Sequence, residues 1–593
     1  MIFLGRFKVP TRIFFTFLMV ILCLSLKGQV LPVERSVDWR EAGLRDTQNI
    51  GFDFYNVSEL GADNKGLKPI DNLVDSLLNL DHKYGVQIYF EPGTYLFNST
   101  IQLPSNCWIS GAGPQSTHFI FDLNGSGHSF NSNGQKLITD SSSIIRSCEK
   151  GDSFIIIANT QLFQNGDWIY LQQNDSDLIF SNWALNTVGQ IIKVNRISGD
   201  TLYINSQLRL DYLLDRRPKV TKLQMKSNIA LSCFSIERKD NTAPQQSSVI
   251  NLRFAHNCWI SGIESYKTTF GHVTFSAVSH SIVEKCYFHD AFEYGGGGRG
   301  YGVVLQTTTN DCLIENNIFK HLRHSMILQS GANGNVFAFN FSTEPFWTEV
   351  NPIFPSDAAG DIVLHGNYVF CNLFEQNDVQ NIVIDNSHGS NGPYNTFLRN
   401  RASLFGIFFS DSTSPSQNFI GNEVPNTSFP YSLVNYTIQG GNHFTFANNV
   451  KGVTEPKGTD KLDDISYFYS AKPEFVNDFQ WGKIGLPQDL KSASIPATDR
   501  FEKGVLYSGI CGNENQLGNT VTFKKQLKFY PNPATYSINI KGAINVDYKI
   551  IDYLGRVQLK GIVPNDNSIN IEKLKNGIYN IMINDISFTF IKK

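Results

Sequence analysis

A four-residue phrase recurs between positions 257 and 450: an apolar residue, two variable residues, and a fourth position that is usually Asn. The phrase occurs at Val283–Cys286, Ile314–Asn317, Phe337–Asn340, Val369–Asn372, Val383–Asn386, Phe397–Asn400, Phe419–Asn422 and Phe446–Asn449. The fourth positions are 31, 23, 32, 14, 14, 22 and 27 residues apart. Two steps of 14 make one of 28, so most steps correspond to one turn of about 22–32 residues, which indicates a coiled repeat.

Short apolar runs at this spacing predict a β-solenoid, because one turn cannot bury its own apolar side chains. Stacked turns place each strand about 4.8 Å from the next, so that Val, Ile and Phe form internal ladders. Asn tolerates the left-handed backbone conformation of a bend, and its amide can bond to the same amide one turn away. A β-sandwich is the alternative, but its strands would recur every 8–12 residues or so.

The N-terminus predicts export. Arg6, Lys8 and Arg12 precede an apolar run over 13–26, and Lys27 follows it. This order is typical of a secretory signal peptide over residues 1–28, and the run is too short to favour a membrane anchor. The whole chain of 593 residues carries a formal net charge of −3 at pH 7. Removal of four basic residues with the signal peptide makes it more acidic, which argues against a nucleic-acid partner.

Cysteine spacing does not predict a metal site. The eight cysteines outside the signal peptide include no close Cys-x-x-Cys pair. Cys258, Cys286 and Cys312 are 28 and 26 residues apart, about one turn each, which predicts stacked buried thiols. The exported compartment allows disulfides, but the sequence does not assign them.

The first turns carry a family resemblance. An apolar pattern predicts a helix over 70–84, which would cap the open end of the solenoid. The phrases Val86–Tyr95, Ser99–Asn106 and Trp108–Gly113 then follow in order. This order resembles the opening of the pectate-lyase-like superfamily. The resemblance implies an all-β protein whose main domain is a right-handed parallel β-helix.

The spacing of the repeats and the local composition divide the chain into six parts. Gly-Asp turns between short apolar runs predict a small antiparallel β insert, which would either form a wall of a binding groove or be decoration. The predicted parts are the signal peptide (1–28), a cap with the first turns (29–149), the insert (150–215), the β-helix body (216–510), a polar linker (511–526) and a C-terminal unit (527–593).

The C-terminal unit has its own motifs. Phe529–Ala534 contains Tyr-Pro-Asn-Pro, Leu574–Tyr579 ends in Gly-Ile-Tyr, and the chain ends in two lysines. Alternating apolar residues between Asn and Gly turns predict a β-sandwich. The unit resembles the C-terminal sorting domain of Bacteroidetes type IX secretion cargo. That resemblance implies the type IX machinery as a partner, with the mature protein either released or attached to the cell surface. A carbohydrate-binding sandwich is the alternative.

Two clusters of polar residues are candidates for chemistry. Aligning turns on Cys286, Asn317 and Asn340 without a bulge would place Glu293 beside His324 and Asp290 beside His321. The predicted catalytic residues are His324, Arg323, Glu293, Asp290 and His321, and the predicted substrate-binding residues are Arg299, Trp347, Asp361, His365, Asp385, His388, Arg399 and Arg401. For any one of these residues, a solvated turn side chain is the alternative.

These residue types favour an acidic polysaccharide as substrate. A lyase needs a cation for the uronate carboxylate and a base for the C5 proton, which Arg323 and His324 could supply. An inverting glycoside hydrolase needs two carboxylates with room for water, and Asp290, Glu293 and Asp361 are the candidates for them. A non-catalytic glycan-binding adhesin and an epimerase stay open as alternatives. The Gly-His-Gly and Asp-Asp motifs of polygalacturonases and the acidic calcium cluster of pectate lyases are not evident. Ca²⁺ could serve in place of an arginine at the uronate carboxylate, so it stays open as a cofactor. The protein is expected to act as a monomer.

Overall fold

We describe the protein from a computed structural model. The structure describes residues 29–45, 52–240, 246–350, 355–485, 490–491, 493–506, 511, 528–530, 534–541, 546–552, 556–564, 567–583 and 586–593. The predicted signal peptide and nearly all of the predicted linker lie outside these residues. The chain forms two compact units, residues 1–44 with 50–512, and residues 45–49 with 513–593.

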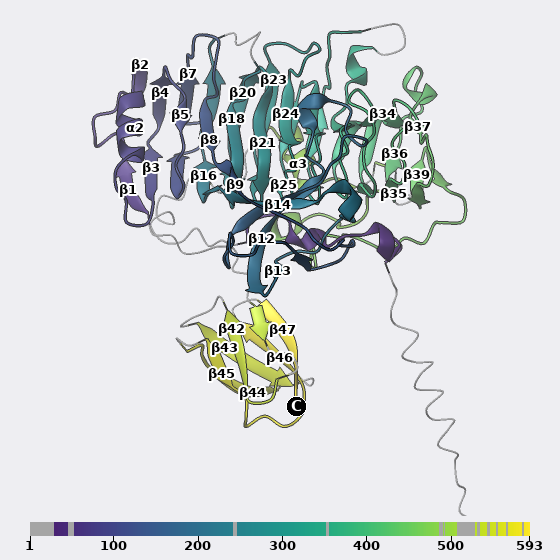
Figure 1. Cartoon of the computed structure of the whole chain (residues 1–593). Helices are drawn as coiled ribbons and strands as arrows, with labels where there is room; N and C mark the ends of the chain where they lie inside the picture. The colour runs from purple at the N-terminus through teal and green to yellow at the C-terminus, as the bar shows by residue number, and fades with distance from the viewer. Residues whose placement is uncertain are drawn as a thin grey trace, which may run out of the picture. The chain divides into compact units, whose positions relative to one another are not determined.

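The larger unit is a parallel β-helix whose strands lie side by side along the solenoid (Figure 1). One wall is a 12-stranded parallel sheet. Its strands are β1 (Asp53–Asn56), β3 (Val86–Phe90), β6 (Cys107–Gly111), β16 (Ile229–Ser232), β19 (Trp259–Ser261), β22 (Ile282–Glu284), β25 (Leu313–Glu315), β28 (Val336–Ala338), β31 (Leu373–Glu375), β33 (Thr396–Leu398), β35 (Asn418–Ile420) and β38 (Phe444–Phe446).

The remaining walls belong to a 22-stranded sheet. Its strands are β2 (Lys65–Pro69), β4 (Gly93–Phe97), β5 (Ile101–Gln102), β7 (Thr117–Phe121), β8 (Phe130–Asn133), β15 (Lys226–Ser227), β17 (Ser235–Arg238), β18 (Ile250–His256), β20 (Glu264–Thr268), β21 (Gly271–Ser279), β23 (Tyr287–Ala291), β24 (Tyr301–Gln306), β26 (Ile318–Lys320), β27 (His324–Leu328), β29 (Phe341–Thr343), β30 (Ile362–His365), β32 (Asp378–Asp385), β34 (Arg401–Phe409), β36 (Glu423–Val424), β37 (Tyr436–Thr437), β39 (Asn448–Val450) and β40 (Val453–Glu455).

The parallel register places residues of the same type above one another inside the solenoid. Phe337 pairs with Phe374, Phe374 with Phe397, and Phe397 with Phe419. Their rings stack with centroids 5.1, 4.8 and 5.0 Å apart. All four side chains are fully buried. The predicted apolar ladder is therefore present, and the all-β solenoid prediction is confirmed.

Two asparagine ladders run up the solenoid, one at each end of the strands of the 12-stranded sheet. In each ladder, an amide nitrogen donates to the amide oxygen one turn on, for example Asn377 to Asn400 at 2.8 Å and Asn372 to Asn395 at 2.9 Å. The same oxygens accept the backbone N–H groups of the preceding turn, at 3.1 Å in both cases. The buried amides are thus satisfied, which keeps their desolvation cost low.

The ladders differ from the sequence prediction in two details. Asn372 belongs to the ladder of Asn335, whereas Asn340 bonds to Asn377. The repeating four-residue phrase therefore combined asparagines from two different ladders, whose positions are five residues apart within one turn. The left-handed bend is also one residue earlier than expected, for example at Arg399 with φ 51°. The Asn itself serves the hydrogen-bond ladder.

An antiparallel sheet of six strands interrupts the solenoid between β8 and β15. We call it the insert. Its strands are β9 (Gln135–Ser143), β10 (Phe154–Ile156), β11 (Trp168–Gln172), β12 (Gly189–Ser198), β13 (Thr201–Ile204) and β14 (Lys219–Gln224). It has its own apolar cluster, which includes Ile155, Ile169 and Leu202. Near the start of the solenoid, helix α2 (Asp71–Leu78) is shorter than the predicted helix and buries Val74, Leu77 and Leu78.

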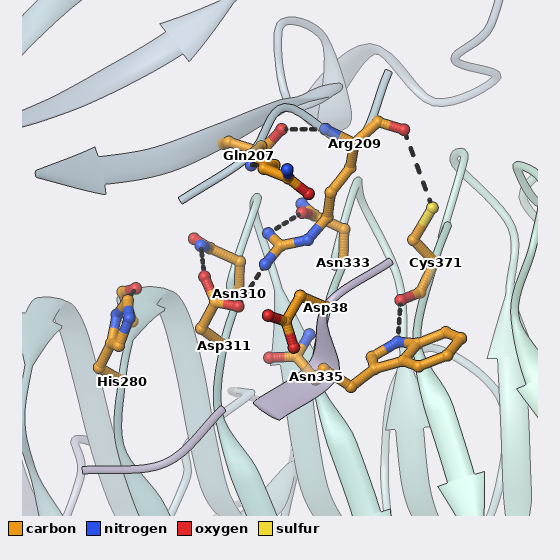
Figure 2. Close-up of polar contacts among 12 residues, drawn as sticks. Asp38, Gln207, Arg209, His280, Asn310, Asp311, Asn333, Asn335 and Cys371 are labelled. Carbon is orange, nitrogen blue, oxygen red and sulfur yellow. Dashed lines mark hydrogen bonds and ion pairs between the residues drawn. The ribbon is translucent and has the colours of Figure 1, made fainter. Parts of the chain in front are cut away.

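Arg209 joins the insert to the β-helix below it (Figure 2). Its guanidinium forms an ion pair with Asp311, and its Nη1 donates to Asn333 Oδ1 at 2.9 Å. The Arg209 and Asp311 side chains are 3% and 0% exposed. From the N-terminal segment, the Trp39 indole donates to the Cys371 carbonyl at 2.7 Å. Three parts of the chain that are distant in sequence are thereby fixed together.

The residues after β40 run back along the outside of the solenoid as a strap (456–485 and 493–506). They include helix α3 (Pro496–Glu502). Beyond α3, Cys511 forms a disulfide with Cys233, with their Cα atoms 5.5 Å apart. The six free cysteines of the described chain, including Cys258, Cys286 and Cys312, are buried.

A buried glutamate under the strap makes stability depend on pH. Glu375 is fully buried and accepts from Ser466 Oγ at 2.6 Å and Tyr467 N at 2.9 Å. Burial raises its pKa to about 7, although these hydrogen bonds act in the opposite direction. Because the folded pKa exceeds the unfolded one, this contribution to stability is full below the unfolded pKa and is lost as pH rises through 7.

We therefore expect the contribution of Glu375 to the free energy of unfolding to fall by about 3 kcal/mol between about pH 5 and 7, at about 1.4 kcal/mol per pKa unit. Buried His272 and His324, whose pKa burial lowers, contribute with the opposite sign. Urea unfolding followed by tryptophan fluorescence would measure the slope. In Glu375→Gln this contribution is lost, so its free energy of unfolding should fall less, or rise more, over the same pH range than that of the unchanged protein. The smaller contribution of Asp361, whose pKa burial raises to about 6, remains in both proteins. An unchanged slope in Glu375→Gln would contradict this assignment.

The smaller unit contains a three-stranded and a four-stranded antiparallel sheet. Their strands are β41 (Lys528–Tyr530), β42 (Ser537–Lys541), β45 (Ser568–Asn570), β43 (Asp547–Asp552), β44 (Val557–Ile562), β46 (Gly577–Ile583) and β47 (Ile586–Lys592). Ile538, Ile550, Ile569 and Ile581 contribute to its buried core. The alternating apolar pattern read from the sequence thus forms a small β domain.

Candidate active site

A cleft of about 720 Å³ lies over the parallel face formed by β18, β21, β24, β27 and β30. Its lining residues come from this sheet, from the insert, and from the segments before β8, β18 and β24 and after β32. They are His128, Trp183, Gln246, Ser248, Asn251, Phe270, Thr274, Gly297, Gly298, Tyr301, Gln306, Thr307, Arg323, Gln329, His365, Ser387 and His388. Amides, hydroxyls and aromatic rings predominate, which suits a sugar ligand.

The strand register brings an imidazole on the cleft floor together with a carboxylate behind it. His365 ends β30, Asp385 ends β32, and the two residues are paired. His365 Nδ1 is hydrogen-bonded to an Asp385 carboxylate oxygen, which also accepts from Ser387 Oγ at 2.8 Å. Burial tends to raise the pKa of Asp385, but the hydrogen bonds from His365 and Ser387 outweigh it and lower the pKa.

An ionised Asp385 can only accept, so Nδ1 of His365 carries the proton. Whenever the ring is neutral, Nε2 is its basic nitrogen. His365 lines the cleft with a side chain that is 7% exposed. This arrangement of an acid, an oriented imidazole and an open nitrogen is the one used by general bases in enzymes.

His324 lies beside this pair but beneath the lining. It is in register with Tyr301 on β24, and the two rings stack at 5.2 Å. Its Nδ1 lies 3.1 Å from the Gly360 carbonyl oxygen, and its ring centroid is 5.9 Å from that of His365. Burial and then the charge of Arg323 lower the pKa of His324, so the ring is neutral at pH 7. Its packing positions Tyr301 and His365.

Arg323 supplies a positive charge within the cleft. Its guanidinium lies 5.8 Å from the ring centroids of both Tyr301 and Trp347, and Nη1 donates to the Gly295 carbonyl. Within the described structure, Nε is buried without a hydrogen-bond partner. A guanidinium that lines a cleft is suited to pairing with a carboxylate.

The insert supplies one wall of the cleft. Trp183 from the 3₁₀ helix η3 (Asn182–Ala184) is 56% exposed and meets the His388 ring edge-to-face at 5.6 Å. Ser181 Oγ lies 3.0 Å from His388 Nδ1, and Asn367 Oδ1 accepts the backbone N–H of Ser181 at 3.0 Å. A fixed, exposed indole at a cleft edge can stack on a sugar ring.

The first predicted cluster does not assemble as expected. The alignment without a bulge holds at Asp290 and His321, whose φ angles of 59° and 51° mark the same bend. It then fails because the chain over 292–300 forms a longer loop. Tyr301, not Glu293, is consequently the residue in register with His324.

The side chains of that cluster turn to other partners. Glu293 pairs with Arg299, and Asp290 contacts His289 Nδ1 at 2.8 Å. The His321 ring stacks on Phe346 at 4.8 Å. None of Glu293, Arg299, Asp290 or His321 lines the cleft. Trp347 is also outside the lining and contacts Arg323 instead.

Three residues of the second predicted cluster are structural. Asp361 is buried and accepts from Ser342 Oγ at 2.6 Å. Arg399 donates to the strap carbonyls of Leu462, Asp464 and Ile484. Arg401 forms ion pairs with Asp378 at 2.9 Å and Glu423 at 3.0 Å. These arginines hold the strap to the solenoid and do not face the cleft.

The structure therefore unites Arg323 and His324 with His365, Asp385 and His388, which the sequence placed in two clusters. Sequence reasoning missed Tyr301, Trp183 and His128. The Gly-rich run before Tyr301 could have indicated the bulge, and an isolated Trp in a polar insert loop could have indicated an exposed contact. Among the described residues, no group of three or more His, Cys, Asp or Glu side chains is placed to hold a metal ion.

Comparison with known families identifies the smaller unit. Residues 528–593 match the family described as secretion system C-terminal sorting domain. The C-terminal unit is a sorting domain. It indicates export through the type IX secretion system, as the motifs predicted, and attachment at the cell surface, which is one of the two fates that the motifs left open. In the described part of the chain, no helix has the length and apolar character needed to cross a membrane.

Several solved structures are similar to this chain at low identity. The tailspike gp49 of Pseudomonas phage LKA1 is 13% identical, with a TM-score of 0.43, over 63% of this chain and 71% of that chain. The tailspike gp61 of Pseudomonas phage phi297 is 12% identical, with a TM-score of 0.40, over 67% and 65%. The A-module of the Azotobacter vinelandii mannuronan C-5 epimerase AlgE6 is 11% identical, with a TM-score of 0.32, over 67% and 92%. No curated protein matches the sequence.

Proposed function

We propose that this exported protein cleaves a uronate-containing polysaccharide by β-elimination in the cleft around His365. The observation that carries the proposal is the combination of an oriented imidazole and an arginine fork in one cleft. The amide-rich and aromatic lining supports a glycan as the ligand. The sorting domain indicates export, and such polymers are met outside the cell.

The residues fit the three requirements of elimination. Arg323 would pair with the uronate carboxylate and lower the cost of negative charge developing at C5. His365 Nε2 would take the C5 proton, with Asp385 stabilising the resulting imidazolium. Burial raises the pKa of Tyr301, which keeps its hydroxyl protonated and able to donate to the leaving oxygen.

The electrons balance in one elimination. The pair from the C5–H bond forms the C4=C5 double bond, and the pair from the C4–O bond leaves with the glycosidic oxygen. That oxygen takes the Tyr301 proton, and the imidazolium of His365 returns a proton through solvent. The products are a new reducing end and an unsaturated uronate.

Hydrolysis fits the cleft less well. Inverting and retaining glycosidases use two carboxyl groups at the scissile bond. Among the described lining residues, none is Asp or Glu, and Asp385 lies behind His365. Glu293 and Asp290, which the sequence suggested for this role, face elsewhere.

The test is an assay of the full chain on a panel of uronate polysaccharides. Elimination should produce ultraviolet absorbance from the conjugated double bond together with new reducing ends. Reducing ends without that absorbance would indicate hydrolysis. Inversion at C5 without cleavage would indicate an epimerase, and retention of the glycan without any product would indicate a binding protein.

Replacement of Arg323 should weaken catalysis on the cleaved polymer. We expect Arg323→Gln to lower kcat/KM by about 10²–10³-fold, because one charge-stabilising donor is lost from a buried site. Arg323→Lys should recover only part of the loss, since a single ammonium does not reproduce the fork. Steady-state kinetics with a melting curve as the folding control would measure both. Full activity in Arg323→Gln would rule out this role.

A further inference from the structure

Positive charge gathers beyond one end of the cleft. Arg253 is exposed on β18, two residues after Asn251, which lines the cleft. Alternate residues of a strand share a face, so both side chains project from the same side. Arg253 pairs with Ser276, and Ser276 pairs with Gln306 of the lining. Arg253 thus continues the column of outward residues that forms the cleft floor.

The insert adds two lysines at this end. Lys136 Nζ donates to Gln172 Oε1 at 2.9 Å and lies 3.5 Å from the centroid of the Tyr170 ring. Gln172 is in register with Lys219 on the neighbouring strand. The Tyr170 hydroxyl contacts Thr308 Oγ1, directly after Thr307 of the cleft lining. The insert therefore holds both lysines beside the cleft.

No carboxylate in the described chain balances these charges. Neighbouring Lys222 pairs with Asp167 at 2.7 Å, whereas Lys136, Lys219 and Arg253 form no ion pair there. Burial and then the charges of Lys219 and Arg253 lower the pKa of Lys136 to about 8. Electrostatic repulsion among neighbouring cations costs free energy, and a bound anion would offset that cost.

We infer that Lys136, Lys219 and Arg253 form a second anion-binding subsite for the polysaccharide that occupies the cleft. The ligand group is a carboxylate or sulfate borne by a sugar away from the cleavage point. Three strand steps, about 14 Å, separate β18 from β27, and the register places Arg253 in the column of Gln329, six residues or about 20 Å along the strand direction from Arg323. The substrate is accordingly a polyanion with negative groups on separate sugars. This inference rests on the cleft as a glycan site but not on the elimination step.

Binding of defined polymers to the full chain tests the subsite without any turnover. The probes are polygalacturonate for carboxylates, dextran sulfate for sulfates, and dextran as the neutral polymer, in affinity electrophoresis at low salt. The variant K136Q/K219Q/R253Q should bind at least one charged polymer about tenfold more weakly or worse, because its charge-assisted contacts are lost. The polymer that is affected identifies carboxylate or sulfate as the ligand group.

The matched control is K65Q/K68Q/R196Q, which removes three exposed cations outside the cleft lining. It should bind as the unchanged protein does. Equal losses in both triple variants, or undiminished binding of both charged polymers by the first, would overturn the inference. If the unchanged protein binds but yields no unsaturated product, elimination fails while the subsite stands. If the first variant turns the polymer over and binds it normally, the subsite fails while elimination stands.

Discussion

Replacing His365 by Asn should reduce turnover of the cleaved uronate polymer by about 10³-fold. Loss of a general base costs about 10²–10⁴-fold, and here the imidazole is also the group that Asp385 orients. Asp385→Asn should cost a comparable factor, because an amide can donate to Nδ1 and stabilise the wrong tautomer. Single-turnover absorbance of the unsaturated product would measure both losses without interference from product release.

His321→Asn is the matched control. His321 was an equal candidate in the sequence, but its ring stacks on Phe346 outside the cleft lining. We expect its turnover to stay within about twofold of the unchanged protein, since surface changes away from the site have small effects. A large loss in His321→Asn, or near-normal turnover in His365→Asn, would show that the active centre lies elsewhere.

Arg209→Met should lower the free energy of unfolding by about 3–5 kcal/mol. The substitution leaves Asp311 fully buried without its ion-pair partner and removes the hydrogen bond to Asn333. The double variant R209M/D311N should recover part of the loss, because no uncompensated charge then remains. Chemical unfolding of the three proteins at one pH would give the energies.

Arg216→Met provides the comparison for an exposed pair. Arg216 and Asp177 also lie in the insert at 2.8 Å, but their side chains are 30% and 60% exposed. Solvent screens such a pair, so we expect a loss below about 1 kcal/mol. Equal losses in the Arg209 and Arg216 variants would mean that the junction in Figure 2 is not a main source of stability.

Several levels of organisation were predictable from the sequence. The β-helix was predictable because residues of one kind recur at the spacing of one turn. Phe374 and Phe397 are one turn apart, and the buried amides of Asn377 and Asn400 are hydrogen-bonded to one another only when the turns stack. The sorting domain was predictable from its motifs. The Gly-Asp turns of the insert predicted its antiparallel strands. They did not predict that Trp183 would line the cleft.

The site was only partly predictable. Alignment by counting fails wherever a loop adds residues, and the loop over 292–300 moved Glu293 away from His324. Charge alone also cannot separate a ligand-binding arginine from a structural one. Arg323 lines the cleft. Arg399 instead donates hydrogen bonds to three backbone carbonyls of the strap, a segment more than 60 residues later in the chain.

The sequence by itself determined the β-helix and the exported sorting domain, because repeated spacing and compact motifs act through contacts that every turn repeats. Only the tertiary structure decided that His365, with Asp385 behind it, shares a cleft with Arg323, while Asp290, His321 and Arg401 lie outside it. The direction of a side chain on a solenoid depends on the register between turns. Loops of unequal length set that register, and it can be read only once the turns are stacked.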